Sequence, residues 1–332
     1  MRMKALTAHL LLAGLLGTSA VQSALVPVTE DITTDTMWTA DNQYRLDTVI
    51  YVQTNATLTI EPGTVVYGAT NVTIARTDIP SLVSALWVTR GGQLIANGTK
   101  ENPIIFTAEG DDLMGSIPPT ETALWGGVVL MGNAQINSAK DAAGNAADPK
   151  FEIFEGTDGP GDNNEHLFGG ADDADSSGSL RYVSIRHAGN EFARAEELNA
   201  LTMGGVGSGT TLEYIEVFAG SDDGFEWWGG NVNSKYLVAA FIEDDDFDTD
   251  QGYRGENQFW FGIKPPWDGT GDSRGMENDG DVDQNALGEE PISQWSAHNV
   301  TLVGRGITDA NYGGGVGANW RDESAPNVFN SV

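Results

Sequence analysis

Two acidic clusters, residues 222–226 and residues 243–250, hold carboxylates at a spacing that suits a divalent cation. We call residues 222–226 the first cluster. In the denser cluster, residues 243–250, an extended chain would turn every second carboxylate to one side. Such carboxylates repel one another, and a Ca²⁺ ion, which prefers six to eight oxygen ligands, would relieve the repulsion. If successive repeats stack, the earlier cluster takes the equivalent position one repeat before. The ligands expected for a calcium site between repeats are Asp222, Asp223, Asp244, Asp246, Asp248 and Asp250. The alternative is a solvated acidic loop.

A second candidate for calcium begins at Asp279. Taking Asp279 as the first position of a calcium loop, Asp281 and Asp283 fall at the third and fifth positions. Glu290 falls at the twelfth position, where such loops place a glutamate. However, the sixth position is Gln284 instead of Gly, and the flanking segments do not look helical. The spacing therefore predicts calcium ligands without an EF-hand.

The first cluster also allows a catalytic interpretation. Inverting glycosidases use two carboxylic groups, one as an acid and one as a base. Asp222 and Asp223 resemble the Asp-Asp motif of polygalacturonases, but the Gly-His-Gly and Arg-Ile-Lys motifs of those enzymes are missing. If the protein is an enzyme, the residues expected to act are Asp222, Asp223, Glu226 and Asp246. Whether any catalysis occurs stays open at this stage.

Two adjacent tryptophans, Trp227 and Trp228, follow the first acidic cluster. On a strand, neighbouring side chains point to opposite faces, so one of the two rings would face outward. An exposed aromatic face can stack on a sugar ring, which makes this pair the candidate for ligand stacking. The alternative is that both rings fill the interior.

The elements that must position these residues are short strands separated by turns. Runs rich in Val, Ile, Thr and Tyr alternate with Gly, Asn and Asp, and the sequence contains 42 glycines. Residues 179–189 align with residues 211–220, so that Leu180 matches Leu212. Stacked coils would bury the inward side of each strand, as in a β-helix. A β-sandwich is the alternative, but the Asn-Gly signal of tight hairpins is scarce. The sequence predicts an all-β, right-handed parallel β-helix, a solenoid of one domain.

The N-terminus reads as a secretory signal peptide over residues 1–24, followed by the β-helix domain over residues 25–332. Two basic residues precede an apolar run that is too short to span a bilayer, and small residues follow it. The chain has no cysteine, so disulfides cannot hold it, and bound ions become a reasonable means of stabilisation. We expect a secreted protein without a transmembrane segment. The exact cleavage site stays open.

The charge of the chain limits its partners. The formal net charge is −31, which makes nucleic acid and anionic membrane surfaces unfavourable partners because the electrostatic term has the wrong sign. A charge of this size indicates either the binding of divalent cations or a surface adapted to high salt. Both can hold in one protein.

Several motifs resemble a family of secreted proteins from Gram-negative bacteria, often named lipoproteins or hypothetical secreted proteins. One of them is Ile-Glu-Pro-Gly-Thr-Val-Val-Tyr-Gly, which ends at Gly68. The segments that carry the resemblance are residues 32–42, 55–68, 125–132, 201–215, 221–232 and 243–250. The resemblance covers nearly all of the chain after the signal peptide and implies a pectate-lyase-like right-handed parallel β-helix. The last segment is a Gly-rich strand close to Val332, from which we expect a β-helix without its C-terminal cap.

These observations favour a secreted, calcium-stabilised β-helix protein of the cell surface or the extracellular matrix. Its expected roles are adhesion, self-assembly or glycan binding, with a glycan or further copies of the same chain as partners. The alternative is a polysaccharide lyase or glycoside hydrolase that acts on acidic polysaccharide through the Asp cluster. The physiological ligand and the oligomeric state do not follow from the sequence.

Overall fold

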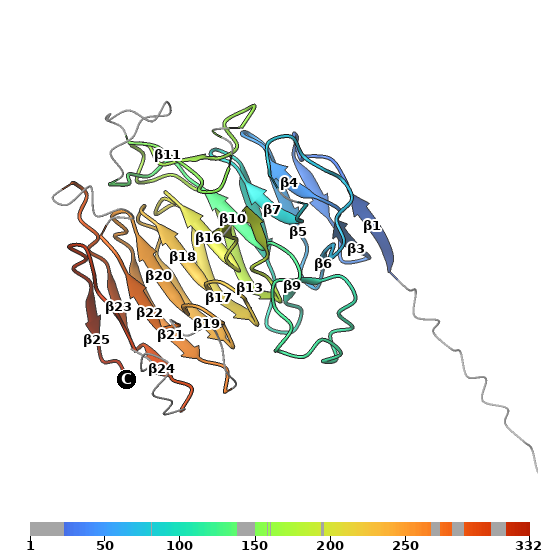
Figure 1. Ribbon diagram of the computed structural model, residues 1–332. Coiled ribbons are helices and arrows are strands. Elements are labelled where there is room, and N and C mark those ends of the chain that lie inside the picture. The colour runs from blue at the N-terminus through green and yellow to red at the C-terminus, as the bar shows by residue number, and fades with distance from the viewer. Residues whose placement is uncertain are drawn as a thin grey trace, which may run out of the picture.

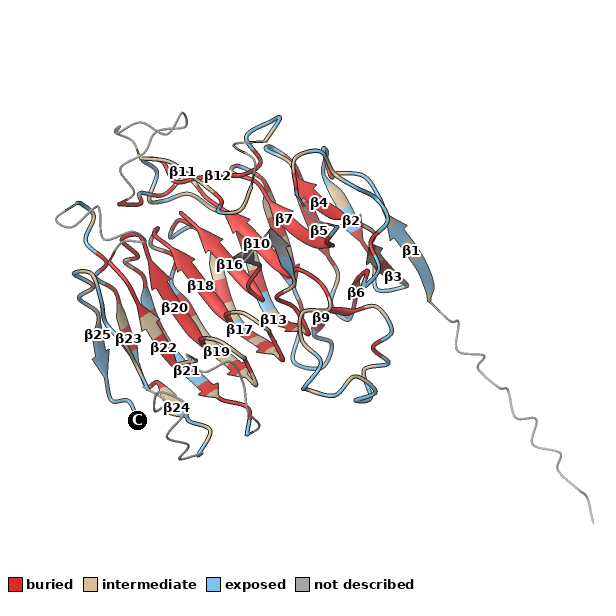
Figure 2. Ribbon diagram, in the orientation of Figure 1, coloured by how far each residue is buried: buried red, intermediate tan, exposed pale blue. Residues whose placement is uncertain are grey.

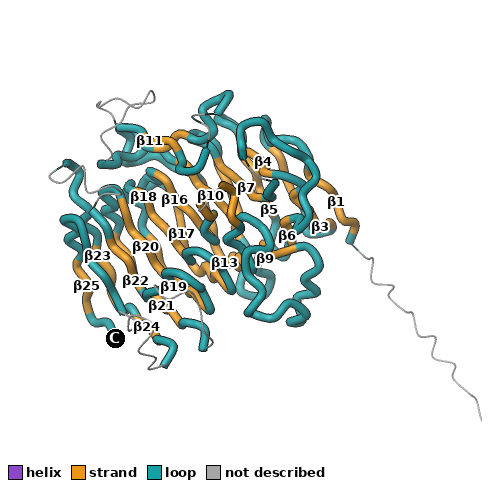
Figure 3. The backbone as a smooth tube through the Cα atoms, in the orientation of Figure 1, coloured by secondary structure: helices purple, strands orange, loops and turns teal. Residues whose placement is uncertain are grey.

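The described part of the chain consists of short strands joined by loops and turns (Figure 3). The computed structural model describes residues 23–80, 82–137, 150–157, 159, 161–193, 196–266, 273–280, 289–306 and 317–332. Within these ranges every regular element is a β-strand, and no segment forms a helix that could cross a membrane. The all-β prediction is therefore confirmed for the described residues.

The strands of the described residues belong to two large sheets and two small ones. The 14-stranded sheet contains β1 (Ala24–Val28), β2 (Thr36–Trp38), β3 (Asn42–Leu46), β5 (Thr57–Ile60), β6 (Val65–Gly68), β8 (Gln93–Asn97), β9 (Ile104–Ala108), β13 (Gly178–Arg186), β17 (Thr211–Phe218), β19 (Ser234–Ala240), β21 (Glu256–Ile263), β23 (Ser296–His298), β24 (Thr301–Val303) and β25 (Asn327–Phe329). The 7-stranded sheet contains β4 (Val49–Val52), β7 (Ala85–Val88), β10 (Val128–Met131), β16 (Leu201–Gly204), β18 (Phe225–Trp228), β20 (Phe247–Asp250) and β22 (Met276–Asn278). The small sheets pair β11 (Glu152–Ile153) with β12 (Leu167–Phe168) and β14 (Glu191–Ala193) with β15 (Glu196–Glu197).

Within the large sheets the strands of successive coils pair in parallel (Figure 1). Leu201 of β16 pairs with Phe225 of β18, which pairs with Phe247 of β20, so that one coil takes 24 residues and the next takes 22. The chain alternates between the 7-stranded and the 14-stranded sheet as it winds. This arrangement is a right-handed parallel β-helix, which confirms the predicted fold.

The 14-stranded sheet bends along a column of aromatic residues. Tyr182, Tyr214, Tyr236 and Phe259 have positive φ angles of 48°, 56°, 59° and 62° in four successive coils. Such angles are unfavourable for bulky side chains, so packing must hold them. The rings stack in order, with centroids 4.5, 4.4 and 4.9 Å apart. This aromatic column fixes the bend that turns each coil toward its next face.

Apolar side chains pack on both faces of the 7-stranded sheet. Most residues of its strands are buried (Figure 2). Inside the solenoid, Leu201, Phe225 and Phe247 form a column in register. On the outer face, Trp87 and Trp228 belong to a second cluster that Phe154 and Phe168 cover. The outer face of this sheet is therefore a packed layer, and polar groups placed on it are withdrawn from water.

Gly178 stands where two coils approach closely, and its substitution should be costly. Its φ angle is 115°, and a Cβ there would lie 2.1 Å from the carbonyl oxygen of Leu94. Gly110 is the matched control, because its φ angle is 93° and no heavy atom lies within 4 Å of an added Cβ. Gly110→Ala should cost about 1 kcal/mol of unfolding free energy through backbone strain. Gly178→Ala should cost about 1–3 kcal/mol more, because the coils must also separate. Urea unfolding of both variants checks this, and equal losses would contradict it.

Candidate metal centre

The turns before β18 and β20 are acidic and are neighbours in consecutive coils. We call residues 221–224 and 243–246 the acidic turns. The backbone N–H of Gly224 donates to the carbonyl oxygen of Asp245 at 2.8 Å. In return, the backbone N–H of Asp245 donates to the carboxylate of Asp223 at 2.9 Å. These two hydrogen bonds lock the acidic turns to each other, so that their side chains cannot move apart without opening the stack.

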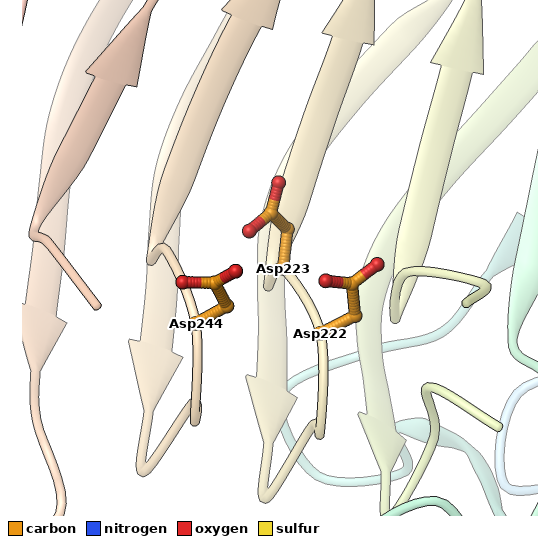
Figure 4. A group of neighbouring side chains, drawn as sticks. All are labelled: Asp222, Asp223 and Asp244. Carbon is orange, nitrogen blue, oxygen red and sulfur yellow. The ribbon is translucent and has the colours of Figure 1, made fainter. Parts of the chain in front are cut away.

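Carboxylates of the acidic turns and of the following strands form two groups that share Asp223. In the outer triad, Asp222, Asp223 and Asp244 offer oxygens within 4.8 Å of one another (Figure 4). In the buried triad, Asp223 is joined by Glu226 of β18 and Asp248 of β20, again within 4.8 Å. Oxygens bound to one Ca²⁺ at 2.3–2.6 Å lie at most about 5 Å apart. Both triads therefore have a spacing that one cation could bridge.

The buried triad is almost fully withdrawn from water. Asp223, Glu226 and Asp248 expose 7, 8 and 9 % of their surface. The side-chain amide of Asn199 donates to Glu226, and Asp223 accepts the backbone N–H of Asp245. Oδ1 of Asp248 has no hydrogen-bond partner among the described residues. None of the basic side chains described forms an ion pair with this triad. The three carboxyls thus lie close together without an ion-pair partner among the described residues.

The electrostatics of the triad follow from this burial. Burial raises the pKa of Asp223, Glu226 and Asp248 well above the usual range, because an ionised carboxyl loses its hydration. Neighbouring carboxylates raise these pKa values further, for example Asp250 acting on Asp248. The site thus favours either protons or a cation of higher charge. A bound divalent cation would hold the carboxyls ionised and remove their mutual repulsion.

Arginines neutralise the next part of the same acidic column. Glu277 of β22 pairs in register with Asp248, and its carboxylate contacts Arg274 at 2.9 Å and Arg321 at 3.0 Å. In the adjacent column Asp250 exposes 9 % of its surface, and burial raises its pKa well above the usual range. Oδ1 of Asp250 also lacks a hydrogen-bond partner among the described residues. Guanidinium groups therefore pair with the Glu277 end of this column. Arg321 also acts electrostatically on Asp248, but neither arginine forms an ion pair with the buried triad in the described part of the chain.

Asp246 does not join the predicted ligand set. The prediction that Asp244, Asp246, Asp248 and Asp250 point to one side is wrong, because residues 243–246 form a corner and β20 begins only at Phe247. Asp246 exposes 1 % of its surface and lies 3.1 Å from the ammonium group of Lys264. Burial raises its pKa to about 6, and Lys264 limits the rise. Asp246 is the acidic partner of a buried ion pair.

The predicted calcium loop after Asp279 is described only at its ends. The carboxylate of Asp279 forms an ion pair with Arg321 at 2.5 Å, and Glu290 is exposed. Asp281 and Asp283 lie outside the described residues. Asp279 thus has a basic partner that the sequence did not predict, and calcium binding by the loop stays a prediction.

Both tryptophans after the first acidic turn are buried. Trp227 exposes none of its surface and stacks on Trp260 inside the solenoid, with centroids 5.1 Å apart. Trp228 points to the other face but exposes only 4 %, because Phe154 and Phe168 pack against it. The prediction that one ring faces solvent is wrong. The covering residues lie in a segment more than fifty positions earlier in the sequence, which no local pattern reveals.

Sequence reasoning missed three further residues around the buried triad. Asn199 precedes β16 and donates to Glu226. The charge of Glu155 raises the pKa of Glu226, and Glu277 extends the column from the next coil. Extending the repeat alignment past residue 250 would have found Glu277. Asn199 and Glu155 lie in connecting segments, where strand periodicity carries no signal.

The calcium-free protein should lose stability as the pH rises from about 5 to 8. Unfolded carboxyls titrate near pH 4, whereas burial and Asp244 raise the pKa of Asp245 to about 8, and burial also raises those of the buried triad. The folded state therefore binds more protons in this window, and the resulting stability disappears as the pH rises through the folded-state pKa values. Burial lowers the pKa values of His166 and His187, and this makes the folded state less stable as the pH falls, which opposes the effect of the carboxyls at acidic pH.

The comparison of wild type with Asp248→Asn isolates the carboxylate contribution. Thermal unfolding in chelator should show the variant more stable at pH 8 and the difference shrinking toward pH 5, since wild-type Asp248 then becomes neutral. A stability difference between the two proteins that does not change with pH would contradict a raised pKa of Asp248.

Comparison with known families agrees with the geometry. The family model described as the pectate-lyase like beta helix domain matches residues 30–318, which is most of the chain. No curated protein and no solved structure matches the chain. The matched residues include both acidic turns and every strand of the 7-stranded sheet. With its parallel strands and stacked sheets, the chain belongs to the family of pectate-lyase-like β-helix domains.

Proposed function

We propose that the chain is a secreted, calcium-stabilised β-helix protein that acts at the cell surface or in the extracellular matrix by binding. The observation that carries the proposal is the buried triad: three carboxylates within 4.8 Å, each more than nine-tenths buried, with no hydrogen-bond partner for Oδ1 of Asp248 among the residues that the structure describes. Uncompensated charges in such a place cost several kcal/mol per ion unless a counter-charge arrives. A cation bound there would hold two coils together.

The donor set favours calcium over other metals. All three groups of the triad are carboxylates, and hard oxygen ligands suit Ca²⁺ or Mg²⁺. Neither triad includes a histidine, and the chain has no cysteine, so the ligands that zinc prefers are absent from them. Calcium tolerates irregular geometry and takes oxygens from water and backbone carbonyls, whereas magnesium requires a near-ideal octahedron. Calcium is therefore the better match for a site between coils.

The burial of the triad supports a role without catalysis. A polysaccharide must reach the acid and the base of a glycosidase, yet Asp223 and Glu226 expose less than a tenth of their surface. Asp246, the fourth candidate for catalysis, belongs to an ion pair with Lys264. Trp227 and Trp228 offer no exposed face to a sugar. Adhesion, self-assembly or glycan binding would use other surfaces of the solenoid.

Secretion is part of the proposal and rests on the sequence. The order of basic, apolar and small residues at the N-terminus supports export, and the absence of cysteine fits a fold held by packing and ions. A buried calcium site also suits an extracellular setting, where weak sites of this ion are occupied.

One observation favours the enzyme alternative. Carboxyls with strongly raised pKa values are what a general acid requires, and the buried triad has them. If the protein were a lyase or hydrolase of acidic polysaccharide, Asp223→Asn would abolish cleavage while leaving the fold intact. Our proposal instead expects the wild type to release no unsaturated or reducing ends from polygalacturonate.

Calcium titration calorimetry tests the proposal directly. The wild type, depleted with chelator and then dialysed, should bind Ca²⁺, and Asp248→Asn should bind it at least about tenfold more weakly, as expected when a charged ligand is lost. Asp41→Asn is the matched control, since Asp41 is exposed and distant from the acidic turns in sequence. Equal binding by all three proteins, or no binding by the wild type, would refute the site.

A further inference from the structure

A polar groove runs along the outside of the 14-stranded sheet, away from the acidic turns. Its volume is about 560 Å³, and it crosses β17, β19, β21 and β23. Side chains from these coils that line it include Thr211, Glu213, Lys235, Gln258 and His298. Neighbouring parallel strands lie about 4.8 Å apart, so the groove extends about 14 Å along the solenoid axis. Its length and direction suit a short linear polymer better than a compact ligand.

The groove is almost balanced in charge, although the whole chain carries −31. Glu213 is neutralised by Arg181, whose guanidinium lies 3.2 Å from its carboxylate. Lys235 and Glu256 supply one charge of each sign. The remaining lining is rich in hydroxyl and amide groups. A polyanion would be repelled by the protein as a whole, and a polycation would be drawn to the acidic turns. An uncharged, hydroxyl-rich ligand fits what remains.

The aromatic column flanks this groove. Tyr214, Tyr236 and Phe259 directly follow the groove residues Glu213, Lys235 and Gln258 in the sequence. The ammonium group of Lys235 lies 5.0 Å from the ring centre of Tyr236 and 5.8 Å from that of Phe259. Tyr214 and Phe259 each expose 38 % of their surface. Because the rings stack on one another, they offer their edges and the tyrosine hydroxyls, which gives the groove an apolar rim with polar tips.

We propose that this groove binds an uncharged, linear oligosaccharide that lies along the solenoid axis. Hydroxyl and amide side chains of successive coils would hydrogen-bond successive sugar units, and the aromatic rim would contact their apolar C–H faces. The inference names a ligand for the binding role proposed above and rests on that role, but it does not involve the buried triad.

The test is titration calorimetry of the calcium-loaded protein with cellohexaose, xylohexaose and maltohexaose, and with hexagalacturonate as the charged comparison. At least one uncharged hexasaccharide should bind, and hexagalacturonate should bind more weakly. Thr211→Ala and Gln258→Ala should each weaken binding about fivefold, as expected for one lost hydrogen bond. Thr301→Ala is the matched control, because Thr301 lies on β24 of the same sheet and does not line the groove. Unchanged melting temperatures would show that the variants fold.

Absence of binding by all three uncharged sugars would overturn the inference, as would tighter binding of hexagalacturonate or equal affinity of the groove variants and wild type. Chromatography of the recovered sugar separates this inference from the proposed function. Intact sugar agrees with both. Cleaved sugar would contradict the proposed binding role, whereas groove-dependent affinity would still support the binding site.

Discussion

In the presence of a chelator, Asp248→Asn should unfold at a higher temperature than the wild type, and in calcium it should unfold at a lower one. Asparagine keeps the shape of the side chain and removes a buried charge that has no basic partner in the described structure. Without an ion, this removal should stabilise the fold by on the order of 1–3 kcal/mol. With calcium at a thousandfold excess over its Kd, the wild type should gain about 4.1 kcal/mol, and loss of a buried charged ligand should leave the variant with little of this gain.

The reversal of order separates a metal site from other roles of Asp248. A side chain that merely packs would make the variant less stable in both buffers, and a solvated carboxylate would change neither. Asp41→Asn, at an exposed position, should leave both melting temperatures unchanged. Thermal unfolding of the three proteins in chelator and in calcium measures the effect. The same order in both buffers would contradict the assignment of Asp248 as a ligand.

Trp260→Ala should cause the largest loss of stability of any single change considered. The ring of Trp260 exposes 1 % of its surface and stacks between Trp227, at 5.1 Å, and Phe247, at 4.6 Å. Its indole N–H donates to the hydroxyl of Ser234 at 2.8 Å. Truncation would leave a cavity in the interior of the solenoid and remove the hydrogen bond from the indole to Ser234, which should cost about 3–5 kcal/mol. Trp320→Ala is the control, because Trp320 exposes 47 %.

Urea unfolding followed by circular dichroism would measure both tryptophan variants. The midpoint should fall strongly for Trp260→Ala and should change little for Trp320→Ala. A loss below about 1 kcal/mol for Trp260→Ala would mean that the interior collapses around the gap, which would contradict a tightly packed column.

The fold was predictable because its repeat is local. The sequence alignment of residues 179–189 with residues 211–220 is the register that the structure shows, with Leu180 paired to Leu212. Parallel stacking follows from strands that repeat without hairpin signals. The position of Glu226 beside Asp248 follows from the same repeat. Stacking of equivalent residues is therefore what a sequence with this periodicity specifies most strongly.

The parts of the site that were predicted wrongly depend on contacts between distant segments. Strand alternation placed Asp246 with Asp248, but a corner precedes β20 and Lys264 pairs with Asp246. Trp228 does face outward from its strand, yet Phe154 and Phe168 cover it. Side-chain direction follows from local periodicity, whereas solvent exposure depends on which remote loop packs on that face.

Calorimetric unfolding of the protein in chelator, in Ca²⁺, and in NaCl of matched ionic strength tests the central claim most directly. If the buried triad holds calcium, Ca²⁺ alone should raise the melting temperature by several degrees, because an ion that binds only the folded state stabilises it. Equal stabilisation by NaCl, or equal melting in chelator and in Ca²⁺, would contradict a calcium-stabilised fold.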